Sequence, residues 1–299
     1  MPSPTFPSLV STEWIAARLG EPTLRPVDAS WYLPASGRDA LGEFRAAHIP
    51  GAVRLDLDAV SDITNPLPHT LPSTGAWARA VGALGIAADS TVVVYDASEM
   101  NLSAPRLWWM FRLFGHRQVA VLDGGLGKWR AEGRPVESGV PAPVPAAYEA
   151  ALDQSRLRTI GAVRLLAAGS GSARTTPLTQ LADARSADRF DGTTPEPRPG
   201  LRSGHIPGSR NLPFMTLVAG DGTLLPPAAL RERFAAAGVD VTRPVVATCG
   251  SGVTACAILH ALAVLGHDDG NALYDGSWTE WGGRADTPVE TGPARPFPP

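Results

Sequence analysis

Short runs of apolar and β-branched residues alternate along the chain with longer stretches that have the apolar periodicity of helices. In the first half, the short runs predict strands over Leu24–Asp28, Val92–Tyr95 and Ala120–Leu122. The longer stretches predict helices over Ser11–Leu19, Gly75–Leu84 and Ala104–Phe114. Strands and helices that alternate in this way are typical of an α/β fold, in which helices flank a parallel sheet.

The second half of the chain repeats three sequence blocks of the first half, in the same order. The paired blocks are Ala47–Ala52 with Gly204–Ser209, Thr91–Asp96 with Val245–Cys249, and Leu122–Leu126 with Tyr274–Trp278. Matching blocks in one order indicate a duplicated domain. We therefore predict two tandem domains, each a parallel sheet flanked by helices.

Proline marks the boundary between the predicted domains. Residues 140–145 read Val-Pro-Ala-Pro-Val-Pro, and prolines cannot continue a helix or a central strand. We predict an N-terminal domain over residues 1–139, a Pro-rich linker over 140–157, and a C-terminal domain over 158–299 that ends in a Pro-rich tail.

Composition and charge exclude several classes of partner. The chain has 299 residues, enough for two cores, and a formal net charge of -3, which gives no basic surplus for nucleic acid. The N-terminus has no basic segment followed by an apolar one, and the apolar run 255–266 is too short to span a membrane. The two cysteines form neither a disulfide framework nor a zinc motif. We expect a cytoplasmic protein without a metal, whose partners are small molecules or proteins.

Cys249 is the strongest candidate for chemistry. It follows the β-forming run Val245–Thr248 and precedes a glycine-rich turn, Gly250–Thr254, and a predicted helix. Backbone N–H groups of such a turn converge on a small volume and favour a thiolate over a thiol. Most free cysteines are instead small buried hydrophobes, and Cys256, inside an apolar helical run, fits that description.

The duplication assigns the chemistry to the second copy, because Asp96 stands in the first copy where Cys249 stands in the second. Ligands of open α/β sheets bind at the carboxyl ends of the strands. A cysteine phosphatase has a similar loop, but it needs an arginine six positions after the cysteine. Ala255 occupies that position, so we exclude phosphatase activity.

The repeated blocks and the cysteine loop resemble the tandem-domain rhodanese family over nearly the whole chain. The loop 249–255, Cys-Gly-Ser-Gly-Val-Thr-Ala, is similar to that of the 3-mercaptopyruvate sulfurtransferase branch. The thiosulfate branch typically has Arg and Lys directly after the cysteine, where this chain has Gly250 and Ser251.

The resemblance implies roles for individual residues. Arg189 and Arg198 match the two arginines that hold the carboxylate and carbonyl of the donor, for which guanidinium forks are suited. Ser251, His69 and Asp58 match a proton relay beside the cysteine. The carboxylate of that relay could also come from a neighbour of Asp58. The alternatives are Asp56 and Asp62.

The resemblance also implies a mechanism. Cys249 attacks the donor sulfur and carries a covalent persulfide, so no separate cofactor is needed. The persulfide is held by backbone N–H groups of Gly250, Gly252, Val253 and Thr254. A small thiol, a thioredoxin-like protein or cyanide then accepts the sulfur. The alternatives are a thiosulfate:cyanide sulfurtransferase and a non-catalytic scaffold that has kept the fold.

Two histidines of the repeated blocks have a simpler explanation. His48 and His205 both precede Ile-Pro-Gly, and the first copy lacks the cysteine. Because the histidine is present even in the copy that has no cysteine, the shared turn explains it better than catalysis does. We therefore predict a structural role for both.

Overall fold

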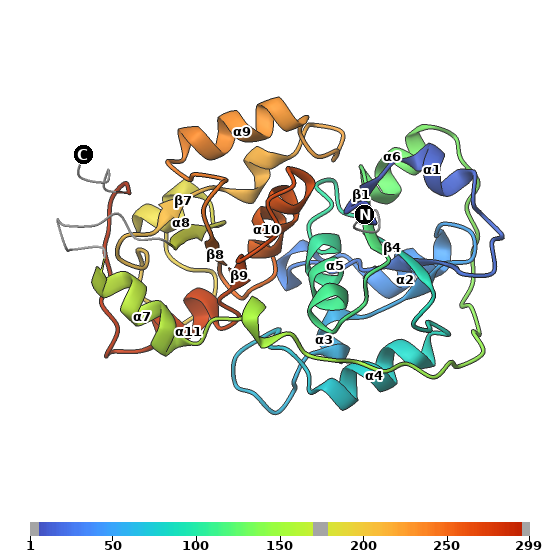
Figure 1. The fold of residues 1–299 in the computed structure, drawn as a ribbon, viewed down its shortest axis with the longest axis horizontal. Coiled ribbons are helices and arrows are strands. Elements are labelled where there is room, and N and C mark those ends of the chain that lie inside the picture. Colours follow the sequence, from blue (N-terminus) through green and yellow to red (C-terminus); the bar gives the residue numbers. More distant parts are fainter. Residues whose placement is uncertain (1–5, 170–178, 295–299) are drawn as a thin grey trace, which may run out of the picture. The chain divides into compact units, whose positions relative to one another are not determined.

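The computed structural model describes residues 6–169 and 179–294, so residues 1–5 and the end of the Pro-rich tail lie outside it. The described chain forms two compact units (Figure 1). The first unit contains the chain up to Asp62, Leu71–Asp153 and Val218–Leu224. The second contains Ile63–Thr70, Gln154–Leu217 and the chain from Leu225 onward. Neither unit is continuous in sequence, and the domain boundaries at residues 139 and 158 remain a prediction.

The first unit is built on a parallel sheet with the strand order β1-β5-β4-β2-β3. Its strands are β1 (Leu9–Val10), β2 (Leu24–Asp28), β3 (Val53–Arg54), β4 (Thr91–Tyr95) and β5 (Val119–Leu122). Its helices are α1 (Thr12–Ala16), η1 (Pro34–Ser36), α2 (Ala40–Ala46), α3 (Leu57–Val60), α4 (Thr74–Ala83), α5 (Ala104–Leu113) and α6 (Gly125–Ala131).

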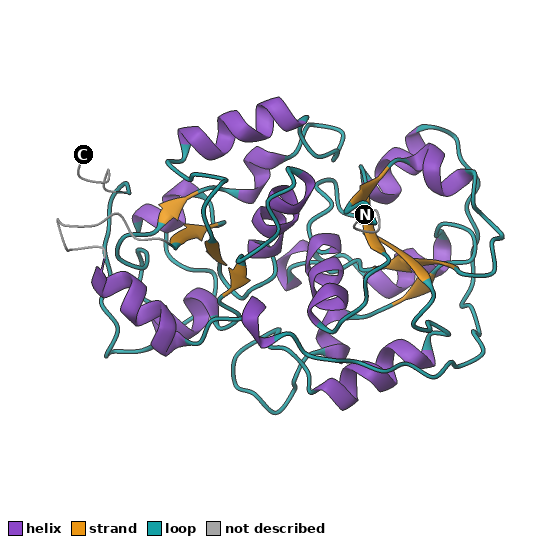
Figure 2. Cartoon of the chain, viewed as in Figure 1, coloured by secondary structure: helices purple, strands orange, loops and turns teal. Residues whose placement is uncertain are grey.

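Helices cover both faces of this sheet (Figure 2). Val93 and Tyr95 of β4 share a core with Ile15, Phe44 and Trp129 of α1, α2 and α6. Because side chains alternate along a strand, the other residues of β4 point to the opposite face, where α5 packs on β4 and β5. Burial on both faces explains why β4 is a continuous run of apolar residues.

The second unit repeats this plan with a parallel sheet of order β7-β6-β8-β9. Its strands are β6 (Gln180–Asp183), β7 (Arg210–Asn211), β8 (Val245–Thr248) and β9 (Ala272–Leu273). Its helices are η2 (Gln154–Arg156), α7 (Ile160–Gly169), α8 (Ala187–Asp191), η3 (Phe214–Leu217), α9 (Pro227–Ala236), α10 (Ala255–Val264) and α11 (Ser277–Gly283). The predicted α/β class and parallel sheets are confirmed in both units.

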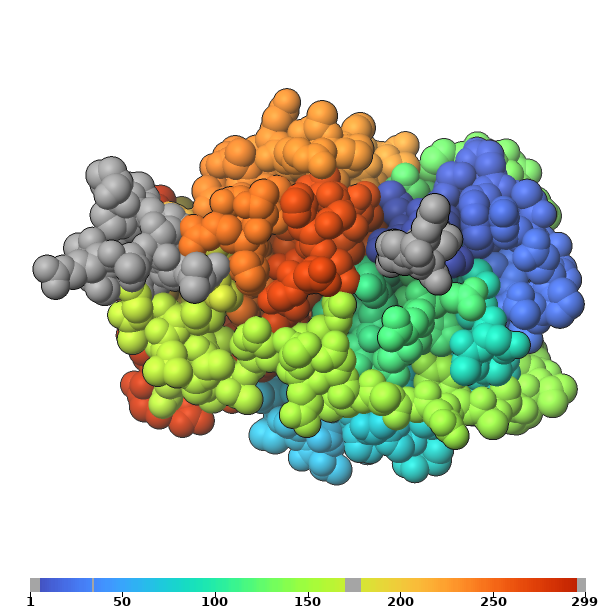
Figure 3. All heavy atoms as spheres, in the orientation of Figure 1, coloured from blue at the N-terminus to red at the C-terminus, as the bar shows by residue number. Residues whose placement is uncertain are grey.

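The Pro-rich stretch is part of the first unit's surface. Residues 140–153 form neither helix nor strand and run over that surface as extended chain (Figure 3). The N–H of Ala146 donates to the carbonyl of Gly82 at 2.9 Å, and that of Ala151 to the carbonyl of Phe114 at 3.0 Å. These bonds fasten the stretch to the ends of α4 and α5. No helix among the described residues is long and apolar enough to cross a membrane.

Equivalent strands of the two units end at equivalent residues. In the register of the first sheet Asp28 of β2 pairs with Tyr95 of β4, and in the second Asp183 of β6 pairs with Thr248 of β8. The next residue after β4 is Asp96, and the next after β8 is Cys249. The fold thus places both residues at the carboxyl edge of a parallel sheet, where α/β proteins bind ligands.

Candidate active site

Cys249 follows β8 directly, and only 1 % of its surface is exposed. Its backbone is held from the start of α11. The N–H of Cys249 donates to Ser277 Oγ at 3.2 Å, and its carbonyl accepts from the N–H of Trp278 at 2.9 Å. The sheet and α11 together therefore fix the direction in which the loop leaves the cysteine.

The loop between Cys249 and α10 presents backbone N–H groups that lack an acceptor. Within residues 6–169 and 179–294, no atom accepts a hydrogen bond from the N–H of Gly250, Ser251, Val253 or Thr254. The ten-residue helix α10 begins directly after them. Unsatisfied N–H groups at a helix N-terminus favour an anion, so the loop suits a thiolate or a persulfide on Cys249.

The first unit shows what such a loop does when it carries its own anion. The buried carboxylate of Asp96 accepts from the N–H of Ser98 at 2.8 Å, of Ser103 at 2.6 Å and of Ala104 at 3.0 Å. The hydroxyls of Ser98 and Ser103 donate to it as well, at 2.5 and 3.0 Å. The Asp96 side chain therefore fills the anion position of the first copy.

Two arginines lie beside the cysteine loop. A Cβ placed on Gly250 would be 3.0 Å from Nη2 of Arg189 and 4.0 Å from Nη1 of Arg198. Both guanidinium groups therefore lie beside the backbone at residue 250. A side chain at this position would require the Arg189 guanidinium to shift by a few tenths of an ångström, so glycine allows the close approach.

A buried chain of alternating charges supports Arg189. Glu196 accepts from Arg189 through both carboxylate oxygens and from Nη1 of Arg185 at 2.8 Å. Arg185 in turn bonds Asp183 at the end of β6, with an Nη2 to Oδ2 distance of 2.6 Å. Burial opposes the charge of Arg185, but Asp183 and Glu196 outweigh that effect and raise the pKa of the guanidinium.

Ser251 and His69 are in direct contact. Nδ1 of His69 lies 2.9 Å from Ser251 Oγ, and the two residues are 8 % and 7 % exposed. His69 belongs to the segment Ile63–Thr70, which is part of the second compact unit. Its φ of 59° is in the left-handed region, which few residues other than glycine adopt, so the backbone is constrained at this point.

Asp58 lies in the first unit, in the short helix α3, and its Oδ2 accepts from Nε1 of Trp31 at 2.9 Å. Asp56 has a separate structural task. Its side chain caps α3 through the N–H groups of residues 58 and 59 and pairs with Arg54. Asp56 is thus engaged in the structure of α3, and Asp58 stays the predicted carboxylate of the relay.

Other residues of the second unit lie in structural surroundings, as expected from the sequence. Cys256 is buried in α10, with its sulfur 3.4 Å from the carbonyl of Gly252. His205 stacks on Phe190, with a centroid distance of 3.7 Å, and its Nδ1 is bound to the carbonyl of the same residue.

The first unit repeats the histidine arrangement with equivalent residues. His48 stacks on Phe44 with a centroid distance of 4.2 Å, and its Nδ1 lies 2.8 Å from the carbonyl of that residue. In both units the histidine therefore connects a helix to the turn that follows it. This shared structural contact explains why both copies have the histidine.

Sequence reasoning missed four residues that hold the site. Ser277 and Thr279 bind the backbone of residues 249 and 250, the latter with Oγ1 2.6 Å from the carbonyl of Gly250. Glu196 and Arg185 fix Arg189. The repeated block 274–278 was a usable signal for Ser277. The Pro-Glu-Pro-Arg segment 195–198 was one for Glu196, but a glutamate between prolines suggests an exposed loop.

Comparison with known proteins agrees with this geometry. The rhodanese-like domain family matches the chain twice, over residues 11–132 and 168–284. The human 3-mercaptopyruvate sulfurtransferase is 45 % identical over 284 residues, which cover 93 % of this chain and 93 % of the human protein. The bovine thiosulfate sulfurtransferase is 46 % identical over 292 residues, which cover 96 % of this chain and 95 % of the bovine protein.

Solved structures show the same fold. SseA from Escherichia coli, described as a 3-mercaptopyruvate sulfotransferase, superposes with a TM-score of 0.81 at 36 % sequence identity. The match covers 91 % of this chain and 99 % of SseA. The matches extend over both copies of the repeat, including the cysteine loop of the second. The chain therefore belongs to the rhodanese family and carries its domain twice.

Proposed function

We propose that this protein is a sulfurtransferase that takes sulfur from 3-mercaptopyruvate through a persulfide on Cys249 and releases pyruvate. One observation carries the assignment: the loop around Cys249 offers N–H groups without an acceptor, whereas Asp96 satisfies the equivalent loop of the first unit. The loop of the second unit thus has no carboxylate of its own and can hold the anionic sulfur of Cys249 or of its persulfide.

The chemistry begins with attack of the Cys249 thiolate on the sulfur of the donor. A sulfur–sulfur bond forms while the bond between that sulfur and C3 of the donor breaks. The electron pair of the broken bond passes to C3 of pyruvate as the enolate, which is then protonated. The outer sulfur of the persulfide retains a negative charge, and the loop N–H groups of residues 250–254 stabilise it.

The arginines bind the part of the donor that becomes pyruvate. Arg189 and Arg198 would hold its carboxylate and carbonyl, and the guanidinium charge stabilises the developing enolate. Their position against Gly250 places both groups beside the nucleophile. The support of Arg189 by Glu196 orients the fork before the donor arrives.

The contact between Ser251 and His69 provides a path for the proton of the donor thiol. In this proposal Ser251 receives the proton and His69 accepts it from the serine, while the family resemblance assigns the orienting carboxylate to Asp58. Histidine suits this role because its ordinary pKa lies near neutral pH. The 2.9 Å separation of His69 Nδ1 and Ser251 Oγ supports the transfer from the serine to the histidine.

A second substrate then removes the sulfur from Cys249. A small thiol, a reduced thioredoxin-like protein or cyanide has the required nucleophilic atom, and the two half-reactions give ping-pong kinetics. The reaction needs no cofactor besides the covalent persulfide. A reducing compartment keeps Cys249 reactive, so we propose that the protein acts in the cytoplasm.

Thiosulfate is the competing donor, since relatives of both names are equally similar to this chain. The loop favours 3-mercaptopyruvate. Its Gly250 adds no cation to the site, and the two arginines beside it are suited to a planar carboxylate and carbonyl. Thiosulfate has no such group, so we expect it to be the poorer donor.

Persulfide formation on defined variants tests the proposal. Intact mass is measured after incubation with 3-mercaptopyruvate or thiosulfate, and turnover is followed with cyanide or a thiol acceptor. Cys249→Ser is expected to gain no sulfur and to lose turnover, whereas the control Cys256→Ser retains both. Turnover in Cys249→Ser would refute the nucleophile. A wild-type protein that never gains sulfur from any donor would be a scaffold rather than an enzyme.

A further inference from the structure

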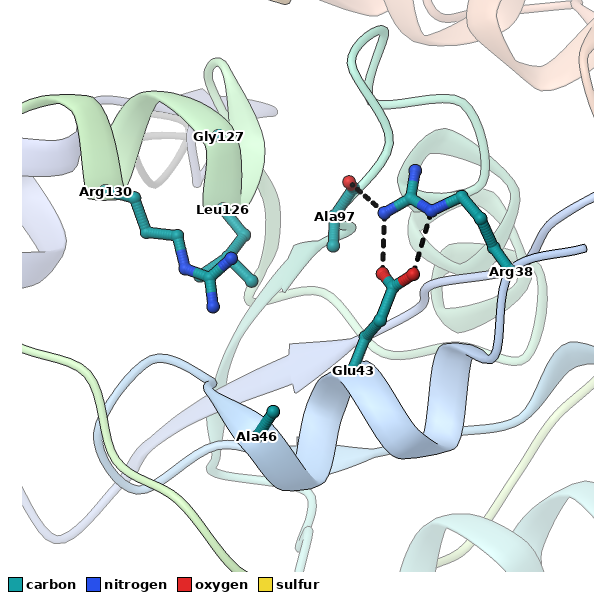
Figure 4. A pocket seen from close by; sticks show the side chains of 7 residues that line it. All are labelled: Arg38, Glu43, Ala46, Ala97, Leu126, Gly127 and Arg130. Carbon is teal, nitrogen blue, oxygen red and sulfur yellow. Dashed lines mark hydrogen bonds and ion pairs between the residues drawn. The ribbon is translucent and has the colours of Figure 1, made fainter. Parts of the chain in front are cut away.

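The first unit contains a cavity of about 290 Å³ that has no part in the chemistry of Cys249. It lies at the carboxyl edge of the first sheet, where Ala97, the residue after Asp96, forms part of its wall (Figure 4). Its walls come from the loop before α2, from α2 itself, from the end of β4 and from α6. The lining residues are Arg38, Glu43, Ala46, Ala97, Leu126, Gly127 and Arg130.

On one wall of the cavity the two charged side chains, Arg38 and Glu43, are paired with each other. Glu43 accepts from Nε of Arg38 at 2.9 Å, from its Nη2 at 2.5 Å, and from the hydroxyl of Tyr32 at 2.7 Å. Arg38 also stacks over the ring of Tyr32 and donates to the carbonyl of Ala97. The charge of Glu43 is thus matched by that of Arg38, and its carboxylate cannot serve a ligand.

The opposite wall carries a second positive charge, Arg130, which acts on the carboxylate of Glu43 only at a distance. Arg130 extends from α6 towards the cavity (Figure 4), and no described residue forms a hydrogen bond or an ion pair with its side chain. With Arg38 and Glu43 paired, Arg130 leaves the cavity with one net positive charge. A single guanidinium favours a monoanion, which it binds through two parallel hydrogen bonds.

The rest of the wall is apolar and leaves room beside the guanidinium. Ala46, Ala97 and Leu126 contribute methyl groups, and a Cβ placed on Gly127 would have no atom within 4 Å. An inorganic anion such as phosphate would gain nothing from these methyl groups. A short carbon chain would be removed from water against them.

The duplication shows what this cavity corresponds to in the second unit. Phe44 and His48 are in the same contact as Phe190 and His205, so Glu43 occupies the position of Arg189. The first copy has therefore replaced a donor-binding arginine by a carboxylate, which Arg38 neutralises, and has an arginine on α6 instead.

We propose that this cavity is a second ligand site and that it binds a small organic monocarboxylate, with the carboxylate on Arg130 and a short carbon chain against Ala46, Ala97 and Leu126. The chemistry at Cys249 is not required for this binding. Its ligands would be 2-oxo acids and similar short carboxylates from the surrounding solution.

Pyruvate is the probe, and saturation-transfer NMR on the full-length protein is the measurement. The second unit is first silenced with Arg189→Gln and Arg198→Gln. In this background we expect the methyl signal of pyruvate to show transfer that weakens roughly tenfold in apparent affinity on Arg130→Gln, as expected for a lost charge-assisted bond. Gly127→Leu fills the cavity from a helical position and is expected to abolish the transfer.

Arg45→Gln is the matched control, because Arg45 is an exposed arginine of α2 that does not line the cavity. It is expected to leave transfer unchanged. Absence of transfer in the silenced background would overturn the proposal, as would transfer that survives both Arg130→Gln and Gly127→Leu. Displacement of pyruvate by equimolar phosphate but not by acetate would overturn the assignment to monocarboxylates.

Discussion

Glu196 binds Arg189 through both carboxylate oxygens, with Nε to Oε1 at 3.2 Å and Nη2 to Oε2 at 2.6 Å. The carboxylate side chain is 2 % exposed and is also paired with the fully buried Arg185, whereas Arg189 is 25 % exposed. One edge of the Arg189 guanidinium is therefore fixed from inside the protein. Glu196 acts as a positioning residue for the arginine that we assign to the donor carboxylate.

Glu196→Gln should weaken donor binding more than it slows turnover. Glutamine is nearly the same size but loses the charge that holds the fork, and charge-assisted hydrogen bonds contribute about 1.5–3 kcal/mol. We expect KM for 3-mercaptopyruvate to rise roughly tenfold while kcat changes little. Steady-state kinetics measures both. The control Asp191→Asn alters a carboxylate on α8, the helix that carries Arg189, and should leave KM unchanged. If Glu196→Gln and Asp191→Asn lowered kcat equally, Glu196 would not have a positioning role.

Replacing the arginines themselves should change donor selectivity. Arg189→Gln and Arg198→Gln remove groups suited to a planar carboxylate and carbonyl, which 3-mercaptopyruvate has and thiosulfate lacks. We expect KM for 3-mercaptopyruvate to increase far more than KM for thiosulfate. Parallel kinetics with both donors and one acceptor gives the comparison. Equal effects on the two donors would argue against the carboxylate role.

The elements that the sequence predicted well are those whose burial is uniform. Strands Leu24–Asp28 and Val245–Thr248 begin and end as expected. The second is a run of small and β-branched residues that are all buried, as is typical of a strand covered on both faces. The first helix was predicted over Ser11–Leu19 but ends at Ala16. Its start at Thr12 is capped by Ser11, whose Oγ accepts from the N–H of Trp14. Turns follow from Ala17 to Gly20, where φ is 88°.

The site was predictable where chemistry is local and was missed where it depends on distant contacts. Cys249 and its loop are one short segment. His69 lies 182 residues from Ser251 in sequence, so only the family resemblance could pair them. Glu196 was overlooked because its ion pair with the buried Arg185, 11 residues earlier, is set by the fold and not by a helix or strand period. No local pattern indicates such a partner.

The hydrogen bond between His69 and Ser251 should make their substitutions non-additive. We predict that Ser251→Ala and His69→Asn each lower kcat roughly 10²–10⁴-fold, as for loss of a general acid–base group. The kcat of the double variant should be no lower than that of the less active single variant. Asparagine is chosen for position 69 because it tolerates the left-handed backbone there. A double-mutant cycle on kcat provides the test, with His267→Asn as the control. Fully multiplicative losses would show that the two residues act independently.

Asp28 should make stability depend on pH. Burial raises the pKa of its carboxyl to about 6, although the N–H of Ser30 donates to it. The folded protein therefore binds this proton more tightly than the unfolded chain, in which the pKa is near 3.8. The contribution to stability is complete below pH 4 and is lost as pH rises through 6, by up to about 3 kcal/mol.

Asp28→Asn removes this titration while keeping an oxygen for the N–H of Ser30. The difference in thermal midpoint, variant minus wild type, should therefore increase between pH 4.5 and pH 7. Thermal unfolding followed by circular dichroism across this range measures it. A difference that stays constant with pH would show that Asp28 keeps an ordinary pKa in the folded protein.

Asp96 should be required for stability rather than for catalysis. Its carboxylate accepts five hydrogen bonds, from Ser98, Ser103 and Ala104, in a fully buried position. Asp96→Ala would leave these donors without an acceptor, and each buried donor left unpaired costs about 1–3 kcal/mol. We expect loss of several kcal/mol from the first unit, visible as a large drop in its unfolding midpoint, with sulfur loading of Cys249 retained in the protein that remains folded.

Restoring a thiol in the first copy should not restore its activity. In Cys249→Ser combined with Asp96→Cys, the loop from residue 96 up to α5 still spans eight residues, whereas the loop from residue 249 up to α10 spans six. Glu43 also stands where the second unit has Arg189. The donor carboxylate thus finds no equivalent arginine. Intact mass after incubation with 3-mercaptopyruvate should show no added sulfur. If this variant does take up sulfur, the donor-binding arginines are dispensable for persulfide formation, and Cys249 owes its reactivity to the loop alone.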